Sequence, residues 1–254
     1  MLKTLGIVKG AHLTERQIQH LNRRLGGRSF LDWVVRQLKS CYQISDVVVT
    51  TDRSIGGETI RRLIPGDVES YVSNGEDSLA CVVDTLKKFQ AESCVFIGAD
   101  WPFLDPIVVD ELVRAATQDP NCDYAAYQFV NETFGNDRNY GLFPEYYRTK
   151  TLLDINPATK DPLYRSLLGT LFLENQRKYK IELLPAPWWL DYGKIRTIVS
   201  GEAGWEVLVT IYETLKDSER CCNIEQVSKL LQNHPGLLDR VAFEKQATMV
   251  VAVG

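Results

Sequence analysis

The first candidate site is a cationic segment that directly follows the first apolar run of the chain. Thr4–Val8 reads as a buried strand. The polar turn after it, which begins at Lys9, is cationic enough to hold phosphate. In an open parallel sheet, ligands bind at the carboxyl ends of the strands. The alternative is a solvated loop or short helix. The candidate nucleotide-binding residues are Lys9, Gly10, His12, Arg16, His20 and Arg28.

A second candidate site begins where another apolar run ends. Cys94–Gly98 reads as a strand and leads into Asp100, in a turn that contains Pro102 and Pro106. A carboxylate held just beyond a buried strand is well placed to bind Mg²⁺ on a nucleotide. Asp105, in contrast, is explained as the N-cap of a helix whose first residue is Pro106. Asp100 is therefore the candidate catalytic and metal-binding carboxylate.

The elements that would position these side chains alternate along residues 1–117. Strands are expected at Thr4–Val8, Asp46–Thr50 and Cys94–Gly98, and helices after the N-cap residues Ser29, Ser78 and Asp105. Such β-α alternation is typical of a parallel sheet covered by helices. Later strands are expected at Lys180–Leu184 and Arg196–Val199, and later helices around Trp205–Leu215 and after Asn223. The prediction is an α/β fold with a mostly parallel sheet of about seven strands.

Composition excludes several classes of function. The 254 residues carry a formal net charge of −4, and their Lys and Arg are scattered, so nucleic acid is not an expected partner. No apolar run approaches the roughly 20 residues that cross a bilayer, and residues 1–10 do not form a signal peptide. A cytoplasmic location without membrane contact is the expectation. The six cysteines form no C-x-x-C pair and have no His nearby in sequence, and Cys81 and Cys94 are expected in the core.

Several segments, in order along nearly the whole chain, resemble the cytidylyltransferases that make CMP-sugars. FIGADWPFLDPIVVDELV, which ends at Val113, is similar to their "GDCPLIDPELIDELI". LGGRSFLDWVVRQL (Leu25–Leu38) is similar to "LGGKPLLERVIERL", and ISDVVVTTD (Ile44–Asp52) to "IDEVVVATS". Ile195–Leu215 and Asn223–Leu237 match further family segments, the last one shared with the spore-coat polysaccharide type. These enzymes are relatives of CMP-Kdo and CMP-sialate synthetases.

The resemblance implies a single-domain GT-A-like nucleotidyltransferase fold over residues 1–217, with a helical extension at 218–254 packed on the same domain. It also implies the reaction of CTP with a sugar or sugar acid to give a CMP-sugar and pyrophosphate, with Mg²⁺ as cofactor. A homodimer is compatible with it. Arg16 matches an arginine of the family's first loop, and Asp100 its metal-binding aspartate. The implied sugar-binding residues are Asn139, Gly141, Glu145 and Arg165.

The same resemblance shows where charged residues are missing. Ala11 stands where the family has a phosphate-binding Arg, and His20 where it has Lys. Ser200 stands at the second metal-binding Asp, which leaves Ser200 or the nearby Glu202 beside Asp100 as further metal ligands. Removing one well-placed electrostatic group typically slows such chemistry roughly 100- to 1000-fold. The expectation is a degenerate, weak site in which Lys9 or His12 can take over part of the lost charge.

Three functions follow as alternatives. The first is a cytidylyltransferase with a remodelled site, acting in nucleotide-sugar and surface-polysaccharide biosynthesis. The second is a non-catalytic relative that binds a nucleotide, a sugar or a partner protein. The third is a GT-A glycosyltransferase, which the absence of a D-x-D motif from the sequence disfavours. CTP binding with and without Mg²⁺ distinguishes the first two.

Overall fold

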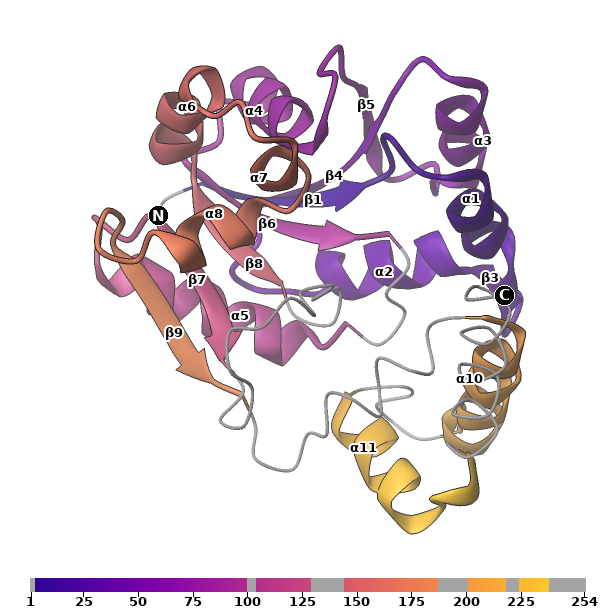
Figure 1. Cartoon of the computed structure of the whole chain (residues 1–254). Helices are drawn as coiled ribbons and strands as arrows, with labels where there is room; N and C mark the ends of the chain where they lie inside the picture. Colours follow the sequence, from indigo (N-terminus) through magenta and orange to yellow (C-terminus); the bar gives the residue numbers. More distant parts are fainter. Residues whose placement is uncertain (1–2, 100–103, 129–143, 187–200, 218–223, 238–254) are drawn as a thin grey trace, which may run out of the picture. The chain divides into compact units, whose positions relative to one another are not determined.

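A central β-sheet carries the fold of this computed structural model, which describes residues 3–99, 104–128, 144–186, 201–217 and 224–237 (Figure 1). The strands are β1 (Thr4–Lys9), β2 (Arg24–Leu25), β3 (Arg28–Ser29), β4 (Asp46–Thr51), β5 (Glu69–Val72), β6 (Ser93–Gly98), β7 (Tyr124–Gln128), β8 (Glu145–Arg148) and β9 (Ile181–Pro185). Seven of them form one sheet in the order β5-β4-β1-β6-β8-β7-β9, and β2 pairs with β3. Among the described strands of the large sheet, only β8 runs antiparallel to its neighbours. The predicted α/β class, with a mostly parallel sheet of about seven strands, is confirmed.

Helices connect these strands and cover both faces of the sheet. They are α1 (Glu15–Asn22), α2 (Phe30–Lys39), α3 (Ile55–Leu63), α4 (Ser78–Phe89), α5 (Pro106–Gln118), α6 (Thr149–Ala158), α7 (Pro162–Ser166), α8 (Leu168–Glu174), α10 (Gly201–Leu215) and α11 (Ile224–Asn233). Figure 1 shows α4, α6, α7 and α8 on one face, with α2 and α5 on the other. No helix among the described residues is long and apolar enough to cross a membrane.

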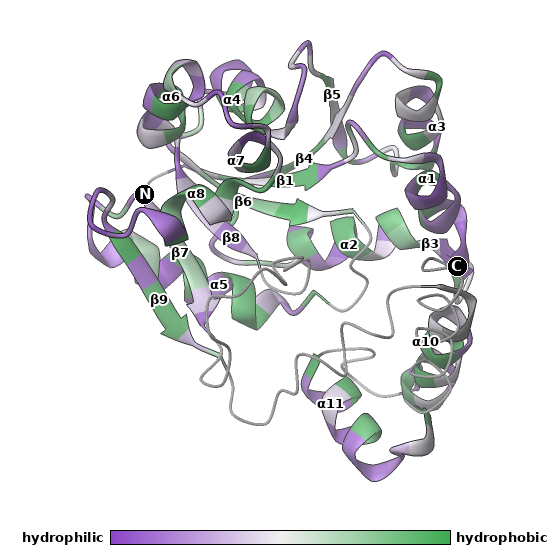
Figure 2. Ribbon diagram, viewed as in Figure 1, coloured by the Kyte–Doolittle hydropathy of each residue, from purple (hydrophilic) through white to green (hydrophobic). Residues whose placement is uncertain are grey.

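The core follows from the period-2 pattern of the buried strands. Leu5 and Ile7 point to the face covered by α4 and pack with its residues Leu79, Val82 and Leu86. On the other face, Gly6 lies against α2, where an added Cβ would come within 2.7 Å of Leu38 Cδ2. Figure 2 shows the hydrophobic residues running along β1 and β6 at the centre of the sheet. Burial of this apolar surface is the main favourable contribution to folding.

Of the three helix N-caps predicted within residues 1–117, two are confirmed by the structure and the third is not. Ser29 accepts a hydrogen bond from the Asp32 N–H, and Asp105 one from the Ile107 N–H, as predicted. The prediction that Ser78 caps α4 is wrong. Asp77 is the N-cap, accepts from the Ala80 N–H, and leaves Ser78 as the first helical residue, buried. A carboxylate also interacts favourably with the positive end of the helix dipole.

Backbone contacts divide the chain into two compact units. The first comprises Met1–Arg24 and Arg28–Ala186 and contains the large sheet. The second comprises Leu25–Gly27 and Pro187–Gly254, and within it α10 contacts α11. The domain boundary predicted after residue 217 borders residues outside the described part of the chain and stays a prediction. The predicted strand Arg196–Val199 and the cap Asn223 also lie outside it.

Candidate nucleotide site at the carboxyl edge of the sheet

Strand register determines which loops meet at the carboxyl edge of the sheet. Lys9, the last residue of β1, pairs with Thr50 of β4 and with Gly98 of β6. The three strands therefore end level with one another at the carboxyl edge of the sheet. The sequence-based argument placed candidate sites after β1 and β6 at this edge, and residues 100–103 of the second one lie outside the described residues. The segment after β4, which contains Asp52, was not among the predicted site residues.

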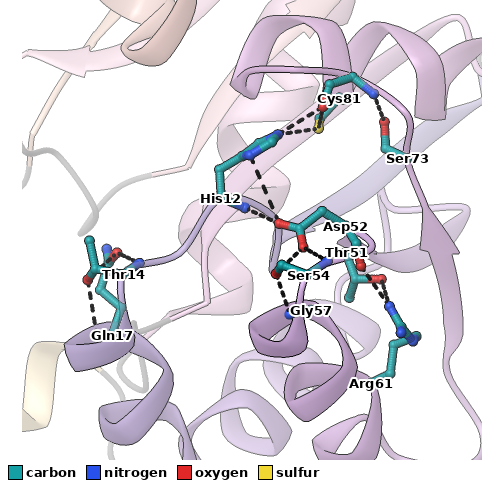
Figure 3. A network of polar contacts seen from close by, with 11 residues as sticks. His12, Thr14, Gln17, Thr51, Asp52, Ser54, Gly57, Arg61, Ser73 and Cys81 are labelled. Carbon is teal, nitrogen blue, oxygen red and sulfur yellow. Dashed lines mark hydrogen bonds and ion pairs between the residues drawn. The ribbon is translucent and has the colours of Figure 1, made fainter.

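The turn after β1 is held by backbone contacts to β4. Gly10 is buried, and its N–H donates to the Thr50 carbonyl at 2.8 Å. His12 adopts a positive φ of 54°, uncommon for a residue other than glycine. The His12 N–H donates to Asp52 Oδ2 at 2.7 Å, which compensates for the local strain. Thr14 then begins α1 through a capping box with Gln17 (Figure 3).

Asp52 is the polar centre of this turn. Its Oδ1 accepts hydrogen bonds from the N–H of Ser54, at 2.8 Å, and from the Ser54 hydroxyl. Partial burial opposes ionisation of Asp52, but the hydrogen bonds from His12 and Ser54 outweigh burial and lower its pKa. Asp52 is therefore a carboxylate at neutral pH, and its charge lies 4.0 Å from His12 Nδ1.

The loop between β5 and α4 completes the cluster. His12 Nε2 lies 2.9 Å from the Gly75 carbonyl oxygen and 3.5 Å from Cys81 Sγ, and Cys81 Sγ lies 3.4 Å from the same carbonyl oxygen. Burial and the charges of Asp52, Asp77 and Asp84 raise the pKa of the Cys81 thiol, although a hydrogen bond with Ser73 opposes them. Cys81 and Cys94 are buried, as predicted.

The remaining predicted cations are spread over neighbouring elements. Arg16 is exposed on α1. His20, also on α1, packs its ring against Phe30 with 4.7 Å between centroids. Arg28, at the start of β3, places its guanidinium 5.5 Å from the Trp33 ring centroid. Lys9 is partly exposed at the end of β1. Of the predicted nucleotide-binding residues, His12 contacts Asp52 directly, and Gly10 lies two residues before His12 in the same turn.

Arg165, predicted from the resemblance to bind sugar, uses every N–H of its guanidinium in hydrogen bonds within the protein. Its Nε and Nη2 donate to the two carboxylate oxygens of Asp77, at 2.5 and 3.2 Å. Its Nη1 donates to the carbonyls of Asn156 and Thr159, and its Nη2 also to Asn156 Oδ1. A guanidinium has five N–H donors, and these five bonds use all of them. The arrangement supports a structural role for Arg165.

Glu145, the other described sugar-binding candidate, begins β8. It accepts hydrogen bonds from the hydroxyls of Tyr124, at 2.7 Å, and Tyr147, at 2.8 Å. Burial raises its pKa above the ordinary value of 4.5, against the effect of the two hydroxyls. The ionised form is thus disfavoured by folding, and the protonated form suits the apolar surroundings better.

Glu145→Gln is expected to change how stability depends on pH. Because the folded protein holds the Glu145 proton more tightly than the unfolded chain, this group favours folding below pH 4.5 and loses that contribution as pH rises toward the folded pKa. The loss approaches about 1.4 kcal/mol per pH unit for one proton. The difference in unfolding free energy between variant and wild type should therefore grow in the variant's favour as pH rises above 4.5. Urea denaturation at several pH values measures it, and a pH-independent difference would contradict the prediction.

The other predicted residues are not described by the structure. Asp100, Asn139, Gly141 and Ser200 lie outside the described residues, and Glu202 lies in α10 with its side chain outside them. Their roles stay predictions. Among the described residues no three His, Cys, Asp or Glu side chains are grouped so as to hold a metal ion.

A cavity of about 640 Å³ occupies a different place in the fold. Asp123, which precedes β7, and Arg148, which ends β8, lie in its wall, together with Lys150 and Asp154 of α6. These positions lie at the amino edge of the parallel strands, away from the turn that contains His12. None of the described candidate residues lines this cavity, so it is separate from the candidate nucleotide site.

Comparison with known proteins places this fold in a family of nucleotidyltransferases. The family model for the MobA-like NTP transferase domain matches residues 16–235. Because this match covers most of the chain, the chain belongs to that family. A search of curated protein sequences found no match.

Solved structures show the same fold. A cytidylyltransferase from Leptospira borgpetersenii serovar Hardjo-bovis (strain JB197) has a TM-score of 0.73 at 15% identity, over 93% of this chain and 96% of the other. A CMP:2-keto-3-deoxy-manno-octonic acid synthetase, determined with CTP, has a TM-score of 0.57 at 15% identity, over 72% and 90%. A Mycobacterium tuberculosis H37Rv protein determined with manganese has a TM-score of 0.53 at 12% identity, over 72% and 88%. The expected nucleotidyltransferase fold is thus confirmed.

Sequence reasoning identified Gly10 and His12 but not their partners. Asp52 ends the segment that resembles the family's "IDEVVVATS", and Gly75 precedes the first residues of α4. The sequence signal for such a site is a polar residue one or two positions after a predicted strand. This signal identified Lys9 and Asp100, and it also applies to Asp52, which follows the predicted strand Asp46–Thr50.

Proposed function

We propose that this protein is a cytidylyltransferase that joins the cytidylyl group of CTP to a sugar or sugar acid and releases pyrophosphate. The observation that carries the proposal is the family match over residues 16–235, together with the level ends of β1, β4 and β6. The fold shared with a CTP-bound CMP-sugar-acid synthetase supports CTP as the nucleotide. A role in cytoplasmic nucleotide-sugar synthesis for surface polysaccharide, of the spore-coat type, is part of this proposal.

The proposed roles of the described residues are electrostatic and positional. In nucleotidyl transfer the protein must neutralise charge on phosphate oxygens and hold the reacting groups in line. Lys9 and Arg16 would attract the triphosphate, and Gly10 lets the turn between them pack closely against β4. Arg28, at the start of β3, and His12 would add positive charge or hydrogen bonds near the same loop. Exposure of Arg16 and partial exposure of Lys9 leave both accessible to a ligand.

A divalent cation is part of the proposal because the manganese-containing neighbour has the same fold. When bound, such a cation neutralises phosphate charge and orients the oxygens. Asp100, with Ser200 or Glu202, is the proposed ligand set. Mg²⁺ usually takes one or two protein carboxylates, so Ser200 in place of a carboxylate weakens the set.

Two described positions support a weak site. Ala11 is 2% exposed and contributes no charge where the family has an arginine. His20 packs against Phe30 in the contact between α1 and α2. Both observations also favour the second candidate function, a non-catalytic protein that binds nucleotide or sugar on the same loop.

Turnover and binding separate these two functions. Isothermal titration of CTP with and without Mg²⁺ measures binding, and pyrophosphate release with a panel of sugars and sugar acids measures turnover. We expect measurable CTP binding and turnover at least about 1000-fold below that of an intact family member, because several electrostatic groups have changed. Ser200→Asp should strengthen Mg²⁺-dependent CTP binding without restoring turnover.

Two results would each contradict a part of this proposal, the first its weak site and the second its nucleotide. Robust wild-type turnover would show that Glu202, Lys9 or His12 replaces the lost groups and that the site is not weak. The absence of CTP binding under both conditions, with binding of another nucleoside triphosphate, would exclude CTP as the substrate. Arg16→Gln, which removes a proposed phosphate contact on an exposed helical surface, should weaken CTP binding, while Arg62→Gln on α3 serves as its matched control.

A further inference from the structure

Three atoms from three different segments converge beside the β1 turn. His12 Nε2 follows β1, the Gly75 carbonyl oxygen follows β5, and Cys81 Sγ lies in the first turns of α4. Their separations are 2.9 Å for nitrogen to oxygen, 3.5 Å for nitrogen to sulfur and 3.4 Å for sulfur to oxygen. Figure 3 shows the imidazole of His12 directed at Cys81, with Asp52 on the other side of the ring.

The backbone holds each of these atoms in place. A Cβ on Gly75 would come within 2.4 Å of the Cys81 nitrogen, so only glycine lets this loop approach α4 closely enough. The hydrogen bond from Ser73 Oγ to Asp84 and that from the Gly75 N–H to Ser73 Oγ fix the loop. The His12 backbone is fixed by Asp52. The three atoms are thus preorganised.

His12 can offer its Nε2 to a cation in one of its two neutral tautomers. Nε2 lies beside the Gly75 carbonyl oxygen and Cys81 Sγ, and Nδ1 lies 4.0 Å from the Asp52 carboxylate. A neutral imidazole carries a proton on only one nitrogen: with the proton on Nε2 the ring donates to the Gly75 carbonyl, and with the proton on Nδ1 the lone pair of Nε2 faces the cluster. A cation bound to Nε2 would leave the proton on Nδ1, facing Asp52. Metal-binding histidines commonly direct their second nitrogen to a carboxylate in this way.

The separations fit one face of a tetrahedral zinc site. With Zn–S near 2.3 Å and Zn–N and Zn–O near 2.0–2.1 Å, tetrahedral angles give separations of about 3.5–3.6 Å for N to S and for S to O, and about 3.4 Å for N to O. The nitrogen–sulfur distance already matches. For zinc to bind, the Gly75 carbonyl oxygen must move a few tenths of an ångström away from His12 Nε2, because two ligands of one metal ion lie farther apart than two hydrogen-bonded atoms.

Charge around the cluster also favours a cation. The carboxylate of Asp84 accepts from Ser73 and from the Asn74 N–H, next to the Gly75 loop. Asp52 adds a second negative charge near His12. Asp77 contributes less because Arg165 pairs with it. Of the described groups around the cluster, two carboxylates thus lack an arginine or lysine ion pair.

We propose that His12 Nε2 and Cys81 Sγ, with the Gly75 carbonyl oxygen, bind a zinc ion, whose fourth position is open to water. Zinc suits this set because it accepts nitrogen and sulfur ligands together. The Cys81 thiol gives up its proton to solvent when the sulfur binds zinc, so binding releases one proton. The bound zinc links the β1 turn to α4 and is distinct from the Mg²⁺ proposed at Asp100.

Cobalt substitution tests this site without nucleotide, so the result is independent of the proposed function. Titration of the metal-free, reduced protein with Co²⁺ should produce a sulfur-to-cobalt charge-transfer band and the visible bands of tetrahedral cobalt. Zn²⁺ should abolish both. Cys81→Ser should abolish the charge-transfer band. His12→Gln should weaken Co²⁺ binding by more than about 100-fold, which exceeds the loss expected when a residue that only hydrogen-bonds a metal ligand is changed. Asp52→Asn, which keeps an oxygen for the His12 N–H, should weaken binding about 10- to 100-fold.

Matched variants test three of the other cysteines and one of the other histidines. The double variant Cys221→Ser/Cys222→Ser, the buried-cysteine variant Cys122→Ser and the exposed-histidine variant His234→Gln should all retain the bands. Thermal unfolding of each variant checks that the fold is intact, and Cys81→Ala provides a second variant at the sulfur position. The proposal is wrong if the wild type gives no charge-transfer band at saturating Co²⁺. It is equally wrong if the band persists in a folded Cys81→Ser variant, or if a folded His12→Gln variant binds Co²⁺ as tightly as the wild type.

Discussion

Arg165→Ala is expected to lower the free energy of unfolding by about 3 kcal/mol. The substitution leaves the Asp77 carboxylate, whose side chain is 25% exposed, without its bidentate partner. It also leaves the carbonyls of Asn156 and Thr159 without a donor. Because Asp77 is the N-cap of α4, the loss also weakens the start of the helix that carries Cys81.

Urea denaturation of wild type and variants measures this effect. Arg165→Lys keeps the positive charge but cannot make five directed bonds, so it should lose nearly as much stability. Arg62→Ala is the control, because its ion pair with Glu58 is exposed and should contribute less than about 0.5 kcal/mol. If Arg165→Ala were as stable as wild type and lost only sugar binding, the family-derived sugar role would be correct and the structural role wrong.

The central strands were predictable because they are buried on both faces. β1, β4 and β6 consist largely of apolar residues, and such runs are read directly from sequence. β5 was not predicted, because Glu69–Val72 is an edge strand with no fully buried residue. Without β5, the loop that carries Gly75 had no expected place beside the β1 turn.

The contacts of the candidate site were predictable only in part. The turn after β1 follows from the rule that ligands bind at the carboxyl ends of parallel strands. The partners of His12 lie 40, 63 and 69 residues away in sequence, at Asp52, Gly75 and Cys81. No local pattern links residues so far apart, so sequence analysis placed Cys81 only in the core. The cap of α4 was misplaced by one residue for a similar reason: Asp77 and Ser78 are both good capping residues.

The β1 turn itself resists restoration of the family's residues. The resemblance to cytidylyltransferases aligns Gly10 with an alanine, but a Cβ on Gly10 would lie 2.7 Å from the Thr50 carbonyl oxygen and 3.0 Å from Ile60 Cγ2. At position 11 the family has arginine, but Ala11 is 2% exposed. Both changes therefore add atoms where this backbone is already packed. The missing arginine is therefore one part of a changed turn, in which His12 also has a positive φ.

Ala11→Arg is expected to lower the free energy of unfolding by about 3 kcal/mol and to leave pyrophosphate release as weak as in the wild type. The cost combines overpacking, about 1–3 kcal/mol, with partial burial of a guanidinium. Gln19→Arg, at an exposed position of α1, adds the same charge nearby and should change stability by less than about 0.5 kcal/mol. Denaturation and a pyrophosphate-release assay with CTP measure the two effects. A stable Ala11→Arg variant with turnover raised 100-fold would show that the turn accepts the family conformation, and that one missing side chain, not the shape of the turn, limits the site.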